Sequence, residues 1–193
     1  MDTNSATKDK IMQAAKELIF CDGRFNATTE EIAQKAAVTR TVIHYYYRSM
    51  EKLFFSIYDD ALEDFLILNE VLHLKNLSLK EKVSTYIVCT DAILSRYPFR
   101  DIYLITYIMK SQDVRKISLI ENIKDFLNEI QIAISEKKVA YKDPVAFLTD
   151  MISLTAYPYV INILLSALRD DNNSAPESFE SRKSTIMIHL FGQ

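Results

Sequence analysis

Residues 41–54, TVIHYYYRSMEKLF, place three consecutive tyrosines between a histidine and an arginine. Neighbouring side chains on a helix point about 100° apart, so a single apolar face cannot use all three rings. At least one ring is therefore expected to face away from the core. Tyrosine hydroxyls commonly donate hydrogen bonds to phosphate oxygens, and arginine can bind guanine through two parallel hydrogen bonds. The chemistry that this stretch favours is contact with nucleic acid.

Patterns typical of catalysis or metal binding find little support in the sequence. The chain holds only two glycines, which excludes a glycine-rich phosphate loop. His73 and His189 have no partner pattern for a metal site or an activated nucleophile, and Cys21 and Cys89 are neither clustered nor paired with histidines at metal spacing. We therefore expect a protein that is not an enzyme, with no catalytic residues, no metal and no cofactor.

The composition indicates helices. Of 193 residues, 49% are hydrophobic and 25% are charged, which is ordinary for a soluble globular protein, yet there are only two glycines and four prolines. Sheets joined by tight turns need more of both, so we expect an all-α fold with short polar links. The first ten residues lack the apolar core of a signal peptide, and we expect a cytoplasmic protein.

One stretch is long and apolar enough to suggest a membrane span. Residues 151–168, MISLTAYPYVINILLSAL, carry no charge. Pro158 and Asn162 interrupt this stretch, and no cluster of Lys or Arg flanks it to orient it in a bilayer. We expect no membrane here but a helix buried on most sides, at a subunit interface.

Capping residues predict where the helices begin. We expect a first helix over 7–20, ended by Gly23, and a second that starts at the capping box of Thr28 and Glu31. Thr39 can cap a third helix, and Ser49 can cap a long fourth one. Further helices are expected near 78–97, 99–111, 113–137, 143–169 and 177–191, with a kink at Pro158.

The second and third helices are separated by only a few residues, which is the helix-turn-helix arrangement. In that arrangement the third helix lies in the major groove of DNA and the second crosses the phosphate backbone. On a wheel of the third helix, Ile43 and Tyr47 point toward the core. The side chains that we expect to contact double-stranded DNA are Thr29, Arg40, Thr41, Val42, His44, Tyr45, Tyr46 and Arg48.

Residues 8–54 resemble the DNA-binding domain of the TetR family of transcriptional regulators. The matching stretches are KIMQAAKELIF and FNATTEEIAQKAAVTRTVIHYYYRSMEKLF. The family often has glycine where Ala37 and Thr41 stand, and lysine where Met50 stands. Ala37 implies a turn that either avoids a positive φ or tolerates some strain. Met50 removes a phosphate contact that Arg48 can replace.

The charge of the chain tests the DNA interpretation only weakly. Residues 1–55 carry a net charge of +1, and residues 56–193 carry −4. The N-terminal part is the more positive of the two, as expected of a DNA-binding domain. Glu30 and Glu31, however, lie near the proposed phosphate face and oppose binding. We expect modest non-specific affinity, with specificity set by a few contacts and by dimer geometry.

The resemblance implies two domains, residues 1–55 for DNA binding and a larger helical domain over 56–193 for ligand binding and dimerisation. Tyr86, Tyr103 and Tyr107 suit the walls of a pocket for a small amphipathic ligand, although packing in a helical core explains each ring equally well. We expect a homodimer through the last two helices.

Taken together, these expectations describe a ligand-responsive regulator, a repressor that binds a palindromic operator and is released by a small molecule. One alternative is a DNA-bound adaptor whose C-terminal domain binds a protein. A closed cavity would favour the ligand, and a solid core with an exposed apolar patch would favour the adaptor. Another alternative is a small helical enzyme without recognisable motifs, which would show turnover and no DNA binding.

Overall fold

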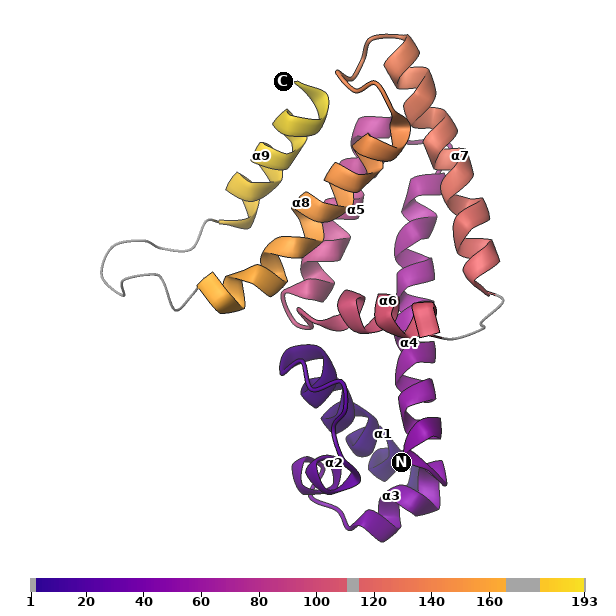
Figure 1. Cartoon of the computed structure of the whole chain (residues 1–193), viewed down its shortest axis with the longest axis vertical. Helices are drawn as coiled ribbons and strands as arrows, with labels where there is room; N and C mark the ends of the chain where they lie inside the picture. The colour runs from indigo at the N-terminus through magenta and orange to yellow at the C-terminus, as the bar shows by residue number, and fades with distance from the viewer. Residues whose placement is uncertain (1–2, 111–114, 166–177, 193) are drawn as a thin grey trace, which may run out of the picture. The chain divides into compact units, whose positions relative to one another are not determined.

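The computed structural model describes residues 3–110, 115–165 and 178–192, and every regular element in these ranges is helical (Figure 1). The predicted all-α fold is confirmed. In chain order the elements are α1 (Thr3–Lys16), η1 (Glu17–Cys21), α2 (Thr29–Lys35), α3 (Arg40–Tyr47), α4 (Met50–Glu70), η2 (Val71–His73), α5 (Leu79–Leu94), α6 (Arg100–Lys110), α7 (Arg115–Ser135), α8 (Pro144–Leu165) and α9 (Phe179–Phe191).

The caps expected from the sequence begin the helices of the N-terminal part. The hydroxyl of Thr28 accepts a hydrogen bond from the backbone N–H of Glu31, whose carboxylate accepts from the N–H of Thr28 at 2.7 Å. Thr39 and Ser49 start α3 and α4 in the same way, each accepting from the N–H three residues on, at 3.4 and 3.2 Å. Each cap satisfies a backbone donor that has no partner inside its own helix.

The first helix differs from its expected bounds of 7–20. It begins at Thr3, and from Glu17 to Cys21 it widens into a π-helical turn. This turn buries residues 18–20 in succession, which a regular α-helix on one apolar face does not do. Gly23 follows with a φ of +68°, the left-handed conformation that was expected to end the helix.

The chain divides into two compact units, and the first comprises Met1–Phe65 together with Arg96–Ser111. Within it, α6 packs on the π-helical turn. The backbone N–H of Phe99 donates to the carbonyl of Phe20 at 2.9 Å, and the rings of Tyr97 and Tyr103 meet the Phe20 ring edge-on at 5.6 Å. The N-terminal helices therefore share a core with α6. The domain boundary at residue 55 stays a prediction, and these compact units divide the chain at other residues.

The second unit comprises Leu66–Ser95 and Gln112–Gln193, with its core between α5, α7, α8 and α9. A polar cluster joins three of these helices. Arg182 of α9 donates to the carboxylate of Asp91 on α5 at 3.0 Å and lies over the ring of Tyr159 on α8, 4.5 Å from its centre. Burial and the hydrogen bond to Asp91 raise the pKa of Tyr159 to about 12.

Residues 151–165 of the uncharged stretch form part of α8, and its residues 166–168 lie outside the described residues. The single chain buries only one face of this helix. Phe147, Met151 and Thr155 are buried at intervals of four residues, whereas Ile152 and Tyr157 are 41% and 59% exposed. Within the single chain the helix is therefore not buried on most sides, and its burial at a subunit interface stays a prediction. Among the described residues, Pro144–Asn162 is also the only segment whose length and composition would allow it to cross a membrane, which is weak evidence for doing so.

Candidate nucleic-acid interface

The turn between α2 and α3 is closed by two backbone hydrogen bonds. The N–H groups of Ala37 and Val38 donate to the carbonyls of Gln34 and Ala33 at 3.1 and 3.0 Å. Ala37 has a φ of +53°, in the left-handed region that glycine adopts most readily. The sequence left open whether Ala37 avoids a positive φ or tolerates strain, and the structure shows that it tolerates strain.

One side of α3 holds the helix to the core of its unit. Ile43 and Tyr47 are buried, as the wheel predicted. The hydroxyl of Tyr47 donates to the carbonyl oxygen of Lys8 on α1 at 3.4 Å. Burial, followed by the nearby carboxylate of Asp9, raises the pKa of Tyr47 to about 12, so its hydroxyl stays protonated at neutral pH.

The opposite side of α3 faces solvent. Tyr45 is 62% exposed, and its ring meets the ring of Tyr46 edge-on at 5.1 Å. Tyr46 is half-buried, so the three consecutive tyrosines occupy an outer, an intermediate and a buried position. Thr41 and His44 are exposed beside Tyr45. The expected spatial separation of the rings is confirmed, and contact of these side chains with DNA stays a prediction.

The N-terminus of α3 lies close to α2. Arg40, the first residue of α3, forms an ion pair with Glu30 of α2, and both side chains are about 60% exposed. Thr29, at the start of α2, and Val42, in the first turn of α3, are half-buried. The predicted contact residues of the two helices thus lie on neighbouring elements. The pairing of Arg40 was not foreseen, although Glu30 was noted as an unfavourable charge.

Arg48 lies beyond the end of α3, which corrects its placement on the helical wheel. It is the C-terminal cap, with a φ of +63°, and its backbone N–H donates to the carbonyl of His44 at 3.0 Å. The Nδ1 atom of His44 lies 3.4 Å from the carbonyl oxygen of Arg48. Because the chain leaves the helix at Arg48, the 100° spacing no longer sets the direction of its side chain.

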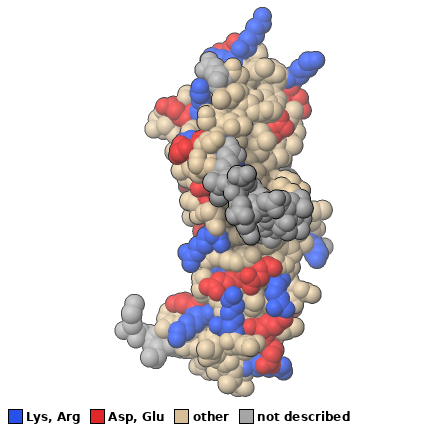
Figure 2. Space-filling model, turned by 90° about the vertical axis from the view of Figure 1, so that its left-hand side faces the viewer, with Lys and Arg blue, Asp and Glu red and all other residues tan. Residues whose placement is uncertain are grey.

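Lys and Arg do not form a continuous basic patch over the N-terminal helices on the face shown in Figure 2, where they alternate with Asp and Glu. Arg24 pairs with Glu31 as Arg40 pairs with Glu30. Hydrogen bonds from the backbone and hydroxyl of Thr28, and then Arg24, hold the pKa of Glu31 below its usual range. The carboxylate is therefore ionised at neutral pH and offsets part of the basic charge.

The three tyrosines expected to contact a ligand lie in packed surroundings. Tyr86 is buried in the core of the second unit. In the first unit, the hydroxyl of Tyr103 donates to the carbonyl of Phe54 at 3.1 Å, and Tyr107 stacks on Tyr58 with ring centres 4.3 Å apart. These contacts match the alternative that the rings are core residues. Their contact with a ligand stays a prediction.

Comparison with known proteins places the helix-turn-helix in a family. Residues 11–57 match the family model of the bacterial regulatory proteins of the tetR family. No curated protein matches the sequence. Solved structures match over nearly the whole chain. AibR, in complex with isovaleryl coenzyme A and operator DNA, has a TM-score of 0.68 at 16% identity, covering 96% of this chain and 98% of its own.

Two further structures agree with this fold. A mutant of HlyIIR has a TM-score of 0.63 at 19% identity, with 97% of this chain and 98% of its own covered. SCO4942 from Streptomyces coelicolor has a TM-score of 0.61 at 20% identity, with 96% and 98% covered. At these identities the structures show the fold alone, an all-α fold with an N-terminal helix-turn-helix.

Fold and sequence match thus define the N-terminal part of the chain as a helix-turn-helix domain within an all-α fold. More particularly, residues 11–57 match the helix-turn-helix domain of bacterial regulatory proteins of the tetR family.

Proposed function

We propose that the protein is a repressor that binds a palindromic operator as a homodimer and leaves it when a small amphipathic molecule binds. The observation that carries DNA recognition is the outer face of α3. Tyr45 is largely exposed although its neighbour Tyr47 is buried, and Arg40 lies at the helix N-terminus, where backbone N–H groups favour phosphate. This action would place the protein in the cytoplasm, where bacterial DNA lies.

The apolar surface of α8 and α9 supports the homodimer. Large hydrophobic side chains on these helices that are 39–59% exposed in the single chain are Val145, Ile152, Tyr157, Leu165 and Ile188. Apolar side chains gathered on two helices are typical of an interface between subunits. Two such helices from each subunit would form a four-helix bundle and give the two DNA-binding heads a fixed spacing.

Two observations support a small-molecule ligand. AibR, whose fold this chain shares, has been crystallised with isovaleryl coenzyme A and operator DNA, so that protein combines both kinds of binding. The second unit of this chain contains a hollow of about 660 Å³, a volume typical of ligand sites. Because the hollow is partly open to solvent, it is not the closed cavity that would decide against the adaptor alternative.

A selection of bound DNA from random sequence tests the proposal directly. We expect the full-length protein to enrich an inverted repeat, with half-sites about one helical turn or more apart. On that DNA, Tyr45→Ala and Arg40→Ala should abolish specific binding and leave a folded dimer, as judged by circular dichroism and light scattering. Met109→Ala is a matched control, because Met109 is 79% exposed on α6.

Unchanged DNA binding in both variants would exclude α3 as the recognition helix. Repression is tested separately, by placing the enriched site between a promoter and a reporter gene. Expression should fall when the wild-type protein is present and should not fall with Tyr45→Ala. A rise in expression with the wild-type protein would indicate an activator.

A further inference from the structure

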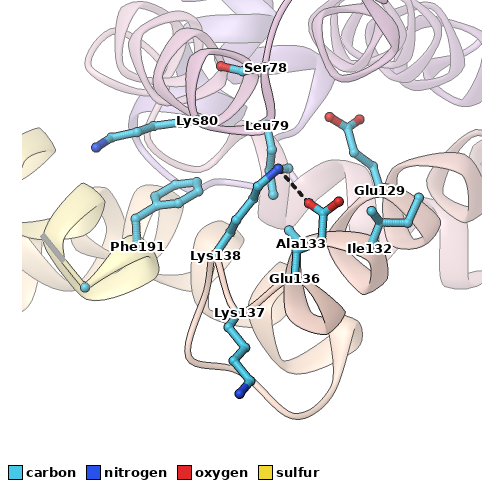
Figure 3. A pocket seen from close by; sticks show the side chains of 11 residues that line it. Ser78, Leu79, Lys80, Glu129, Ile132, Ala133, Glu136, Lys137, Lys138 and Phe191 are labelled. Carbon is cyan, nitrogen blue, oxygen red and sulfur yellow. Dashed lines mark ion pairs between the residues drawn. The ribbon is translucent and has the colours of Figure 1, made fainter.

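The hollow of about 660 Å³ lies at one end of the second unit, where three helices meet. Its walls are the N-terminus of α5, the C-terminal end of α7 with the turn that follows, and the C-terminus of α9 (Figure 3). None of the tyrosines predicted from the sequence to bind a ligand lines it. The side chains that do line it combine apolar groups with lysines.

The apolar side chains of the hollow come from all three helices. Leu79 of α5, Ala133 of α7 and Phe191 of α9 line it together with Ile132, which is 57% exposed. An isoleucine that stays more than half exposed leaves apolar surface in water. The body of a ligand would cover this surface, and the hydrophobic effect would favour its binding.

Lysines line the polar side of the hollow. The ammonium group of Lys80 lies 5.9 Å from the centre of the Phe191 ring, and the ammonium group of Lys138 pairs with Glu136 at 2.6 Å. In Figure 3 the amine of Lys138 points between Leu79 and Glu136, whereas the amine of Lys137 points away. Lys138 is therefore placed to meet an anion inside the hollow.

The turn after α7 holds Lys138 in this position. Its backbone N–H donates to the carbonyl of Ala133 at 2.9 Å, and Lys137 adopts a φ of +57°, as in the turn that ends many helices. The second carboxylate of the hollow, Glu129, is paired with Lys82 at 2.5 Å. Each glutamate thus already has a lysine partner. Three lysines line the hollow against two carboxylates, and Lys137, whose amine points away, adds its positive charge only at the rim.

We propose that this hollow binds a small organic carboxylate with an apolar body. The carboxylate takes the place of Glu136 as the partner of Lys138, and the apolar body covers Ile132 and Phe191. Binding requires only this unit of the chain. Its effect on the operator rests on the proposed function, because α9 supplies both a wall of the hollow and part of the proposed dimer surface.

Isothermal titration calorimetry of the full-length protein without DNA tests the site, with sodium hexanoate as the probe. We expect saturable binding that strengthens by up to about fourfold for each added methylene from butanoate to octanoate. The neutral 1-hexanol and the cationic hexylammonium should bind at least tenfold more weakly. Saturable binding of hexanol as tight as that of hexanoate would overturn the role of the anion, and no binding of hexanoate would overturn the site.

Variants of exposed residues locate the binding without disturbing the core. Lys138→Gln and Ile132→Asp should each weaken hexanoate binding at least tenfold, and Lys142→Gln, which changes an exposed lysine outside the hollow, should leave it unchanged. Equal binding by wild type and both hollow variants would exclude this location. Because DNA is absent, the result is independent of the DNA selection, which alone decides the proposed repressor function.

Discussion

The ion pair between Arg40 and Glu30 predicts that a single charge removal strengthens operator binding. The change is Glu30→Gln, which keeps the size and shape of the side chain and removes its charge. In the free protein Glu30 neutralises Arg40, and that pairing must be given up if Arg40 is to contact phosphate or guanine. In the Glu30→Gln variant, Arg40 has no ion pair with residue 30 to give up before it contacts DNA.

The exposure of the pair limits the size of the effect. Arg40 and Glu30 are 63% and 60% exposed, so the pair contributes about 0.2–1 kcal/mol. A dimer has two such pairs, which gives about 0.4–2 kcal/mol, or roughly twofold to 30-fold tighter binding. The free energy of unfolding should fall in Glu30→Gln. Glu30 lies in the first turn of α2, where a negative charge stabilises the helix by about 0.3–1 kcal/mol.

Fluorescence anisotropy on the selected operator measures the affinity, and urea unfolding measures the stability. The gain in affinity should shrink as salt is raised, because exposed charges are screened. Glu70→Gln is the matched control, since Glu70 is exposed at the far end of α4 and its loss should leave affinity unchanged. Operator affinity that is unchanged or weaker in Glu30→Gln would refute the inference that Arg40 leaves Glu30 for DNA.

Two further predictions concern the stability of the fold. Ala37→Gly should raise the free energy of unfolding by about 0.5–1 kcal/mol in urea, because relief of left-handed strain exceeds the entropy cost of glycine. The same change at exposed Ala92 within α5 should lower it by about 1 kcal/mol, and a loss at both positions would contradict the argument. Hydrogen bonds from Tyr141 and then His189 hold the pKa of Asp150 below its ordinary value of 3.8, so its carboxylate stabilises the fold above that pH and less as pH falls below it. Asp150→Asn should therefore melt at a lower temperature than wild type at pH 7, and a difference that persisted undiminished at pH 3 would count against this linkage.

Local signals made much of the fold predictable. Thr28, Thr39 and Ser49 cap α2, α3 and α4 as expected, because a side-chain cap depends only on residues three positions apart. The burial of Ile43 and Tyr47 also followed from helical periodicity alone. These features are encoded within one turn of the chain, where spacing in the sequence fixes spacing in the structure.

Features that depend on packing between distant elements were not predictable. The π-helical turn from Glu17 to Cys21 buries three successive residues because α6, about 80 positions further along, packs on it. The hollow brings Lys80, Lys138 and Phe191 together from the ends of three helices, and no local pattern joins them. The helical wheel assumed that Arg48 is helical, but its own φ is +63°, so the wheel does not set the direction of its side chain.

The charges of the proposed DNA-binding helices explain why such a protein would need two DNA-binding domains, one from each subunit of a dimer. Arg24 and Arg40 are each paired with a glutamate of α2, so they attract DNA less than free arginines would. One head with a net charge of +1 over residues 1–55 is therefore expected to bind DNA weakly. Joining two heads makes the second contact intramolecular and can strengthen binding by about 10²–10⁴-fold, but only when their spacing matches the half-sites. In the proposed mechanism, a ligand would therefore not need to act on the recognition helix. Favouring a dimer with a different spacing would remove this gain, and each DNA-binding domain alone would be too weak to hold the operator.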